Sequence, residues 1–190
     1  MTHQIVFFMQ ISFSLNNRMY RSSGKPIHIG IALSFVGADQ PNTYGVPRAW
    51  SRPYEGSGFV GDVNQGSGCN FHEYYLVPHC NGTHTECVGH ITAQPMSVHQ
   101  CLRESLIPAT LVTVLPVAAA HTREAEHYTP ALAPEDLLIT RAALEQCAIS
   151  APFHRALVIR TLPNDPSKTN RDYMAQHPPF FTLEAMAYIV

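Results

Sequence analysis

Proline and glycine interrupt this sequence so often that long regular elements are excluded. The chain has 15 prolines and 11 glycines among its 190 residues. Proline breaks the hydrogen-bond ladder of a helix or a sheet, and glycine marks turns. We therefore expect short helices and strands joined by turns, and neither long helices nor a coiled coil.

Composition bounds the size of the domain and the class of partner. With 45% hydrophobic and 14% charged residues, the chain is long enough for one domain over residues 1–190 with a sizeable core. Its formal net charge of -2 gives no long-range attraction to nucleic acid or to an anionic membrane. No apolar run approaches the length that spans a bilayer. We expect no nucleic acid and no membrane among its partners.

The amino terminus and the cysteines indicate the compartment. The apolar stretch at residues 5–9 is short, follows no basic residue and soon gives way to polar residues, which is not typical of a signal peptide. The five cysteines are an odd number spread over a mid-sized chain, unlike the even set of a disulfide framework. We expect reduced thiols and a cytoplasmic location.

Hydrophobic periodicity predicts an α/β fold. In residues 26–33 apolar side chains occupy every second place, which predicts a strand whose core face carries Ile27, Ile29, Ile31 and Leu33. Strands alternating with short helices are typical of a mixed α/β domain. The other predicted elements are strands at residues 71–77, 106–115, 136–139 and 156–161, and a helix at residues 141–147 capped by Thr140.

Residues 36–68 differ from the rest in being rich in Gly, Pro, Asn and Ser, and they predict one long loop with little regular structure. Loops of this length are uncommon in compact domains and are often functional. The aromatic side chains of Tyr44, Trp50 and Phe59 either wall an apolar substrate pocket or pin the loop to the core. The sequence leaves both interpretations open.

The carboxyl terminus predicts a short helix after Thr182, whose hydroxyl is placed to cap it. Its apolar side chains at helical spacing form one face, which carries Leu183, Met186, Ala187 and Val190. A helix this short does not persist in water without tertiary partners. We therefore expect a fold that is incomplete at the carboxyl terminus.

The segment from Cys80 to His90 concentrates the side chains that could carry chemistry. Cys80 and His84 flank a turn at Gly82, and in an extended chain His84, Glu86 and His90 would share one face. A thiolate, an imidazole and a carboxylate are all ligands that zinc accepts, and a zinc site with an open position activates water. The spacing predicts a transition-metal site.

This segment resembles the His-x-Gly-Thr-His-x-Asp-x-Pro-x-His signature of the cyclase family, which includes bacterial kynurenine formamidases. The Gly-Thr pair of the signature is retained at positions 82 and 83. The resemblance extends along nearly the whole chain, to residues 26–29, 70–79, 156–161 and 178–185.

The resemblance implies a role for each matching residue. Cys80 falls on the first metal-binding His, His84 on the second, and Glu86 on the Asp that can bridge two ions. His90 falls on the final His, a candidate for proton transfer beside the metal. His79 is off the signature by one residue, and we expect it to point elsewhere.

Several departures alter the implied site. Cys80 and Glu86 change the ligand type, and Val88 replaces the proline of the signature. A thiolate softens the site and favours zinc over manganese, which stays possible. The family's further His and Glu ligands lie downstream of the helix after Thr182 and are absent here, so we expect the first half of a two-metal site.

The resemblance implies a swivelling β/β/α domain with a mixed sheet, often assembled as homo-oligomers. It also implies hydrolysis of a small amide or ester, with deformylation of N-formylkynurenine in tryptophan breakdown as the type reaction. One alternative is a non-catalytic fragment that binds metal or oligomerises. Another is a redox-sensing thiol protein centred on Cys80 and Cys87. No serine-hydrolase elbow, P-loop or dinucleotide fingerprint competes with these.

Overall fold

The computed structural model describes residues 10–15, 17–22, 24–147, 155–175 and 177–190. The apolar stretch at residues 5–9 lies outside this part of the chain. Residues 1–31 and residues 32–190 form two separate compact units. The prediction of one domain over residues 1–190 stays a prediction.

The described part of the first unit is a β-hairpin. Strand β1 (Ser12–Leu15) pairs antiparallel with β2 (Arg18–Arg21). Asn17 takes a left-handed conformation in the turn, with φ of 61°, which asparagine tolerates better than most residues. Phe13 and Tyr20 face each other across the strands with ring centroids 5.3 Å apart, so the pair reinforces the register.

Residues 26–33 correct a prediction, because they form no strand. Ile27 and Ile29 are 84% and 79% exposed instead of facing a core. An alternating pattern yields a strand only where a neighbouring strand takes up its backbone hydrogen bonds. Within the described residues no strand pairs with this segment.

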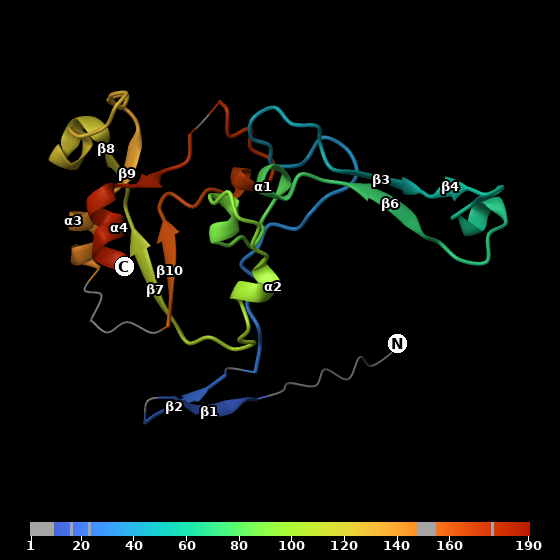
Figure 1. Ribbon diagram of the computed structural model, residues 1–190, viewed down its shortest axis with the longest axis horizontal. Coiled ribbons are helices and arrows are strands. Elements are labelled where there is room, and N and C mark those ends of the chain that lie inside the picture. Colours follow the sequence, from blue (N-terminus) through green and yellow to red (C-terminus); the bar gives the residue numbers. More distant parts are fainter. Residues whose placement is uncertain (1–9, 16, 23, 148–154, 176) are drawn as a thin grey trace. The chain divides into compact units, whose positions relative to one another are not determined.

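The expectation of one loop over residues 36–68 also needs correction, because three short strands form in it. Strand β3 (Trp50–Pro53) pairs antiparallel with β6 (His72–Tyr75), and β4 (Glu55–Gly56) pairs with β5 (Phe59–Val60). Figure 1 shows the first pair continuing into the second. Aromatic contacts across the strands order this region, including Trp50 stacked on Tyr75 at 5.9 Å.

The core lies where parallel strands meet two helices. Strand β7 (Ala109–Val114) pairs in parallel with β10 (Ala156–Thr161), and β9 (Leu137–Ile139) lies between β8 (Val117–Ala118) and β11 (Phe180–Phe181). Helices α3 (Arg141–Gln146) and α4 (Leu183–Ile189) complete it (Figure 1). The buried cluster comprises Val112, Val114, Ile139, Ala143, Leu144 and Ala185. This arrangement confirms the mixed α/β class.

The caps of both helices are confirmed, but the packed face of α4 is not the predicted one. The Thr140 hydroxyl accepts from the Ala143 N–H at 3.1 Å, and Thr182 accepts from Ala185 at 3.0 Å. In α4, however, Ala185 is fully buried while Leu183 and Met186 are exposed. The small side chains of Ala143 and Ala185 let α3 and α4 approach closely, and this contact decides which face is buried.

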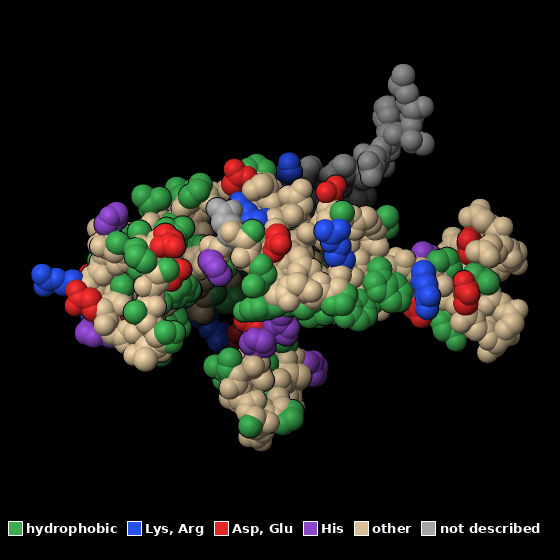
Figure 2. All heavy atoms as spheres, turned by 90° about the horizontal axis from the view of Figure 1, so that it is seen from above, with side chains coloured by type: hydrophobic (Ala, Val, Ile, Leu, Met, Phe, Trp, Pro, Cys, Tyr) green, Lys and Arg blue, Asp and Glu red, His purple; other side chains and the backbone are tan. Residues whose placement is uncertain are grey.

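The remaining elements are single helical turns. They are α1 (Pro78–Asn81), α2 (Val98–Cys101), and the 3-10 turns η1 (Val63–Gln65), η2 (Val88–His90), η3 (Ala119–His121), η4 (Arg123–Ala125) and η5 (Pro166–Thr169). No helix in the described ranges is both long and apolar enough to cross a membrane. Hydrophobic side chains lie open over wide areas of the surface in Figure 2.

Candidate metal centre

The turn α1 sets the geometry of the site. Pro78 begins it, as proline favours the first helical position. Asn81, 1% exposed, ties the turn down: its Oδ1 accepts from the Val77 N–H at 2.7 Å, and its Nδ2 donates to the Pro47 carbonyl at 3.4 Å. This buried amide links α1 to a distant loop and fixes the direction in which the turn presents its other side chains.

Beyond α1 the chain runs extended past Gly82. A Cβ at Gly82 would lie 2.5 Å from Cδ2 of Leu33, so this position leaves little room for a side chain. Residues 83–87 have no regular structure, and η2 then begins after Cys87. The extended stretch carries His84 and Glu86 on alternate residues, which brings both side chains towards the same side.

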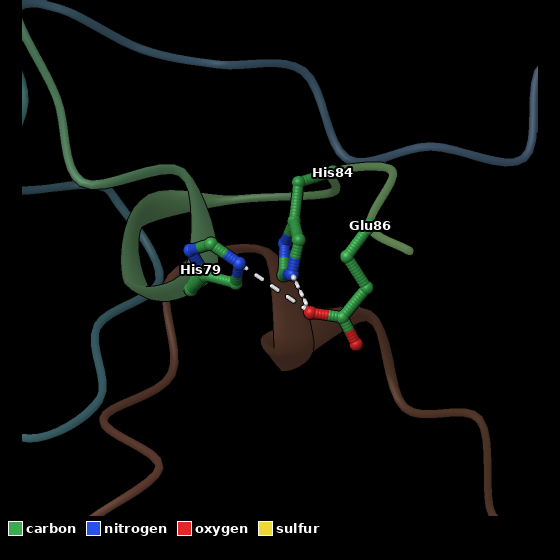
Figure 3. A group of neighbouring side chains, drawn as sticks. All are labelled: His79, His84 and Glu86. Atoms are coloured by element: carbon green, nitrogen blue, oxygen red, sulfur yellow. Dashed lines mark ion pairs between the residues drawn. The ribbon is translucent and has the colours of Figure 1, made fainter. Parts of the chain in front are cut away.

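Three side chains converge here as candidate metal ligands: His79, His84 and Glu86 (Figure 3). Their ligand atoms all lie within 4.8 Å of one another. Oε2 of Glu86 is 3.4 Å from Nε2 of His79 and 3.7 Å from Nε2 of His84. Ligand atoms that each lie about 2.0–2.1 Å from a tetrahedral zinc ion are about 3.3 Å apart. The donor set and its spacing therefore fit a zinc-sized cation.

The tautomer of His84 strengthens this fit. Its Nδ1 lies 3.0 Å from the Gly82 carbonyl oxygen, which can only accept, so Nδ1 carries the hydrogen. In the neutral ring Nε2 then turns a lone pair towards the Glu86 carboxylate. Two acceptors facing each other repel unless a proton or a cation lies between them. A backbone carbonyl that orients the imidazole in this way is a common outer partner of metal-binding histidines.

His90 joins the same carboxylate from η2. Its Nε2 lies 3.8 Å from Oε2 of Glu86, and its ring stacks on that of His79 with centroids 4.3 Å apart. His79 also meets His84 edge to face at 4.8 Å. These four side chains are 28% to 49% exposed, so water and a substrate can reach them.

The prediction that His84, Glu86 and His90 lie together agrees with this geometry, but His79 was expected to point elsewhere, and that is wrong. The expectation was that one residue off the register of the signature, on a strand or a tight turn, would point the side chain elsewhere. In a helical turn successive side chains are rotated by about 100°, so His79 faces Glu86 while Cys80 is buried, 9% exposed. Pro78 was the sequence signal for this turn. The structure does not bring Cys80, the predicted first ligand, into the group.

Two of the three aromatic residues predicted to bind substrate make ring contacts with other aromatic side chains. Trp50 stacks on a tyrosine of β6, and Phe59 contacts Tyr54 and Phe71. Tyr44 is exposed and has a left-handed φ of 56°. For Trp50 and Phe59 these contacts favour the interpretation that aromatic side chains order the segment.

A cavity of about 350 Å³ lies beside Glu86. Its walls are mostly apolar, and Cys87 and Cys101 both contribute to them. The lining residues are Thr85, Glu86, Cys87, Val88, Val98, Cys101 and Leu102. A small apolar group next to the carboxylate would fit such a space.

Comparison with known families assigns the chain. The family model described as "Putative cyclase" matches residues 8–190. The chain belongs to the cyclase family. The match includes the segment from Cys80 to His90 and extends over both compact units. No match to this cyclase-family chain is found among curated proteins or among solved structures.

Proposed function

We propose that this cyclase-family protein is a metal-dependent hydrolase that cleaves the C–N bond of a small amide, an arylformamidase-like reaction of the kind that deformylates N-formylkynurenine in tryptophan catabolism. The observation that carries the proposal is the convergence of three imidazole nitrogens on one carboxylate oxygen, Oε2 of Glu86. Two histidines and a glutamate are a ligand set found in catalytic zinc sites. An ester is the alternative substrate class.

Four side chains at the candidate metal centre would each have a role in the proposed reaction. His79, His84 and Glu86 would hold the ion, which when bound polarises a carbonyl and makes a water molecule a better nucleophile. The second oxygen of the Glu86 carboxylate would orient that water. His90, 3.8 Å from the same carboxylate, would pass a proton to the leaving amine. Zinc is the proposed ion, with manganese as the alternative.

The test is His84→Ala in the whole chain, because His84 is the ligand whose orientation is fixed by a backbone carbonyl. We expect bound zinc, measured by elemental analysis after loading and desalting, and formate release from N-formylkynurenine to disappear together. His127→Ala, outside the group, should change neither. Retention of both zinc and activity in His84→Ala would overturn the proposal.

A second pair of variants separates the two candidate first ligands. His79→Ala should lose zinc, because His79 faces Glu86, whereas Cys80→Ala should keep it, because Cys80 is buried and lies outside the group. Loss of zinc in Cys80→Ala and its retention in His79→Ala would instead make Cys80 the first ligand, as the resemblance to the family signature implies.

A non-catalytic metal-binding or oligomerising protein is the second candidate. It is favoured by the exposure of the ligand side chains, since Glu86 and His79 are 49% and 44% exposed and catalytic ions are held in drier, shaped cavities. Zinc bound in unit stoichiometry without release of formate from any aryl formamide would support this candidate against the hydrolase.

We also propose the finer fold and assembly implied by the family, a swivelling β/β/α domain that forms homo-oligomers. Exposed aromatic side chains on paired strands support the assembly, among them Trp50, Phe59 and Tyr74, because apolar surface of this kind is commonly covered by a partner. Light scattering of the purified protein tests it, and a monomer at all concentrations would contradict it. A cytoplasmic location stays a prediction.

A further inference from the structure

The loop at residues 87–101 begins directly after the candidate ligand Glu86 and closes on itself. The Cys87 thiol donates to the Met96 carbonyl at 3.4 Å. A Cβ at Gly89 would overlap that same carbonyl oxygen, so the two sides of the loop are in close contact. The loop ends in α2, whose start is held by a capping box between Ser97 and Gln100. These contacts hold the start of the loop against Met96, close to its other end.

Two cysteines stand at these ends. Cys87 and Cys101 both line the cavity beside Glu86, where Val88, Val98 and Leu102 supply apolar walls. Cys87 is half-buried and Cys101 is exposed, so a small reagent can reach the pair. Burial, together with a hydrogen bond and charge repulsion from the Cys87 thiol, raises the pKa of the Cys101 thiol.

The other three cysteines have different environments. Cys69 is exposed, Cys80 is buried, and the Cys147 thiol donates to carbonyl oxygens of Thr113 and Ala143. Cys87 and Cys101, by contrast, line the same cavity. This pair differs from the Cys80 and Cys87 pair around which the redox alternative was framed.

We propose that Cys87 and Cys101 form a reversible disulfide that fastens the loop carrying His90 beside the candidate metal centre. The oxidant is a low-molecular-weight disulfide such as glutathione disulfide. One cysteine thiolate attacks it, forming a mixed disulfide and releasing one small thiolate. The second cysteine thiolate then attacks the protein sulfur of the mixed disulfide and releases the other. Two cysteine thiols are oxidised, the small disulfide is reduced to two thiols, and the two cysteine protons end on them.

The consequence for the centre follows from the chain path. Glu86 is the residue before Cys87, and His90 lies inside the closed loop, where its N–H donates to the Cys87 carbonyl at 2.9 Å. A cross-link would restrict the backbone that places both side chains. We expect zinc affinity to differ between the reduced and oxidised protein. This consequence rests on the proposed function, whereas the disulfide itself does not.

The experiment treats the whole chain with glutathione disulfide and compares it with chain kept in dithiothreitol. Thiols are titrated in denaturant, and peptides are mapped by mass spectrometry without reduction. We expect the thiols of Cys87 and Cys101 to be lost and the peptides holding these two cysteines to be joined, with no glutathione on either. Cys69→Ser, the matched control, should form the same link. Cys87→Ser and Cys101→Ser should each lose it and carry glutathione on the remaining cysteine.

Two results would overturn the disulfide: both thiols staying free under conditions that modify Cys69, or cross-links that join other cysteines equally often. The metal readout is separate, with zinc titrated into both redox forms. Equal affinity would overturn the coupling and leave the disulfide standing. If the reduced protein binds no zinc, the proposed function and the coupling of the disulfide to zinc affinity are both contradicted. The peptide map still shows whether the disulfide forms.

Discussion

The core around α3 and α4 and the metal-centre segment at residues 78–90 are held together by different forces. In the core, apolar side chains such as Leu144 and Leu138 are fully buried between strands and helices. In the segment, one buried amide, Asn81, anchors a helical turn, and the candidate ligand side chains remain open to solvent. We therefore expect stability to reside in the first region and the proposed chemistry in the second, and variants should separate the two.

The largest effect is expected from Leu144→Ala in the core. Leu144 is fully buried in the main cluster, and removing a buried leucine side chain costs about 2–5 kcal/mol of unfolding free energy. Urea denaturation followed by circular dichroism measures this loss. The zinc affinity of the folded protein should be unchanged. A variant that loses zinc affinity but keeps the stability of the wild type would contradict the separation of the two regions.

Asn81→Ala is expected to lower both stability and zinc affinity, because Asn81 anchors the segment as Leu144 anchors the core. Loss of its amide leaves the Val77 N–H without its acceptor at 2.7 Å, at a cost of about 1–3 kcal/mol. His79 should lose its fixed direction, so zinc affinity should fall as well. Asn81→Asp is the matched control, since it keeps the acceptor oxygen. Isothermal titration with zinc and thermal unfolding measure both quantities, and unchanged zinc affinity would mean that α1 does not position His79.

Glu124→Gln tests a polar contact that supports the core from outside. The Glu124 carboxylate accepts from the Arg141 N–H at 2.9 Å and from the Thr182 hydroxyl, so it bridges the starts of α3 and α4. Charge-assisted hydrogen bonds at a helix start contribute roughly 1 kcal/mol. We expect the melting temperature to drop by a few degrees with zinc binding unaffected. Glu126→Gln, on an exposed neighbour, should leave the melting temperature where it is.

The smallest effect is a pH dependence at Asp62. Hydrogen bonds from the Asn64 N–H and the Gln65 side chain hold the pKa of Asp62 below its ordinary value. A lowered pKa contributes stability that is present above about pH 3.9 and is lost as the pH falls through the folded-state pKa. Asp62→Asn should therefore melt slightly earlier at neutral pH and match the wild type in strong acid. A difference that persists in acid would assign the effect to packing.

Much of the fold followed from local signals in the sequence. The strands β7, β9 and β10 and the helix starts at Thr140 and Thr182 lie where apolar runs and capping residues predicted them. These features depend on hydrogen bonds and side-chain periodicity within a few residues, so sequence alone carries them. The family, and the grouping of His84, Glu86 and His90, followed from one short segment in the same way.

The tertiary structure decided what depends on distant partners. Residues 26–33 alternate like a strand, but no strand in the described part of the chain pairs with them, and α4 buries Ala185 where it packs with α3. His79 reaches Glu86 because Pro78 begins a helical turn and Asn81 ties that turn to Pro47, far away in the sequence. A pattern states which faces a segment could bury, and only packing against the rest of the chain selects one.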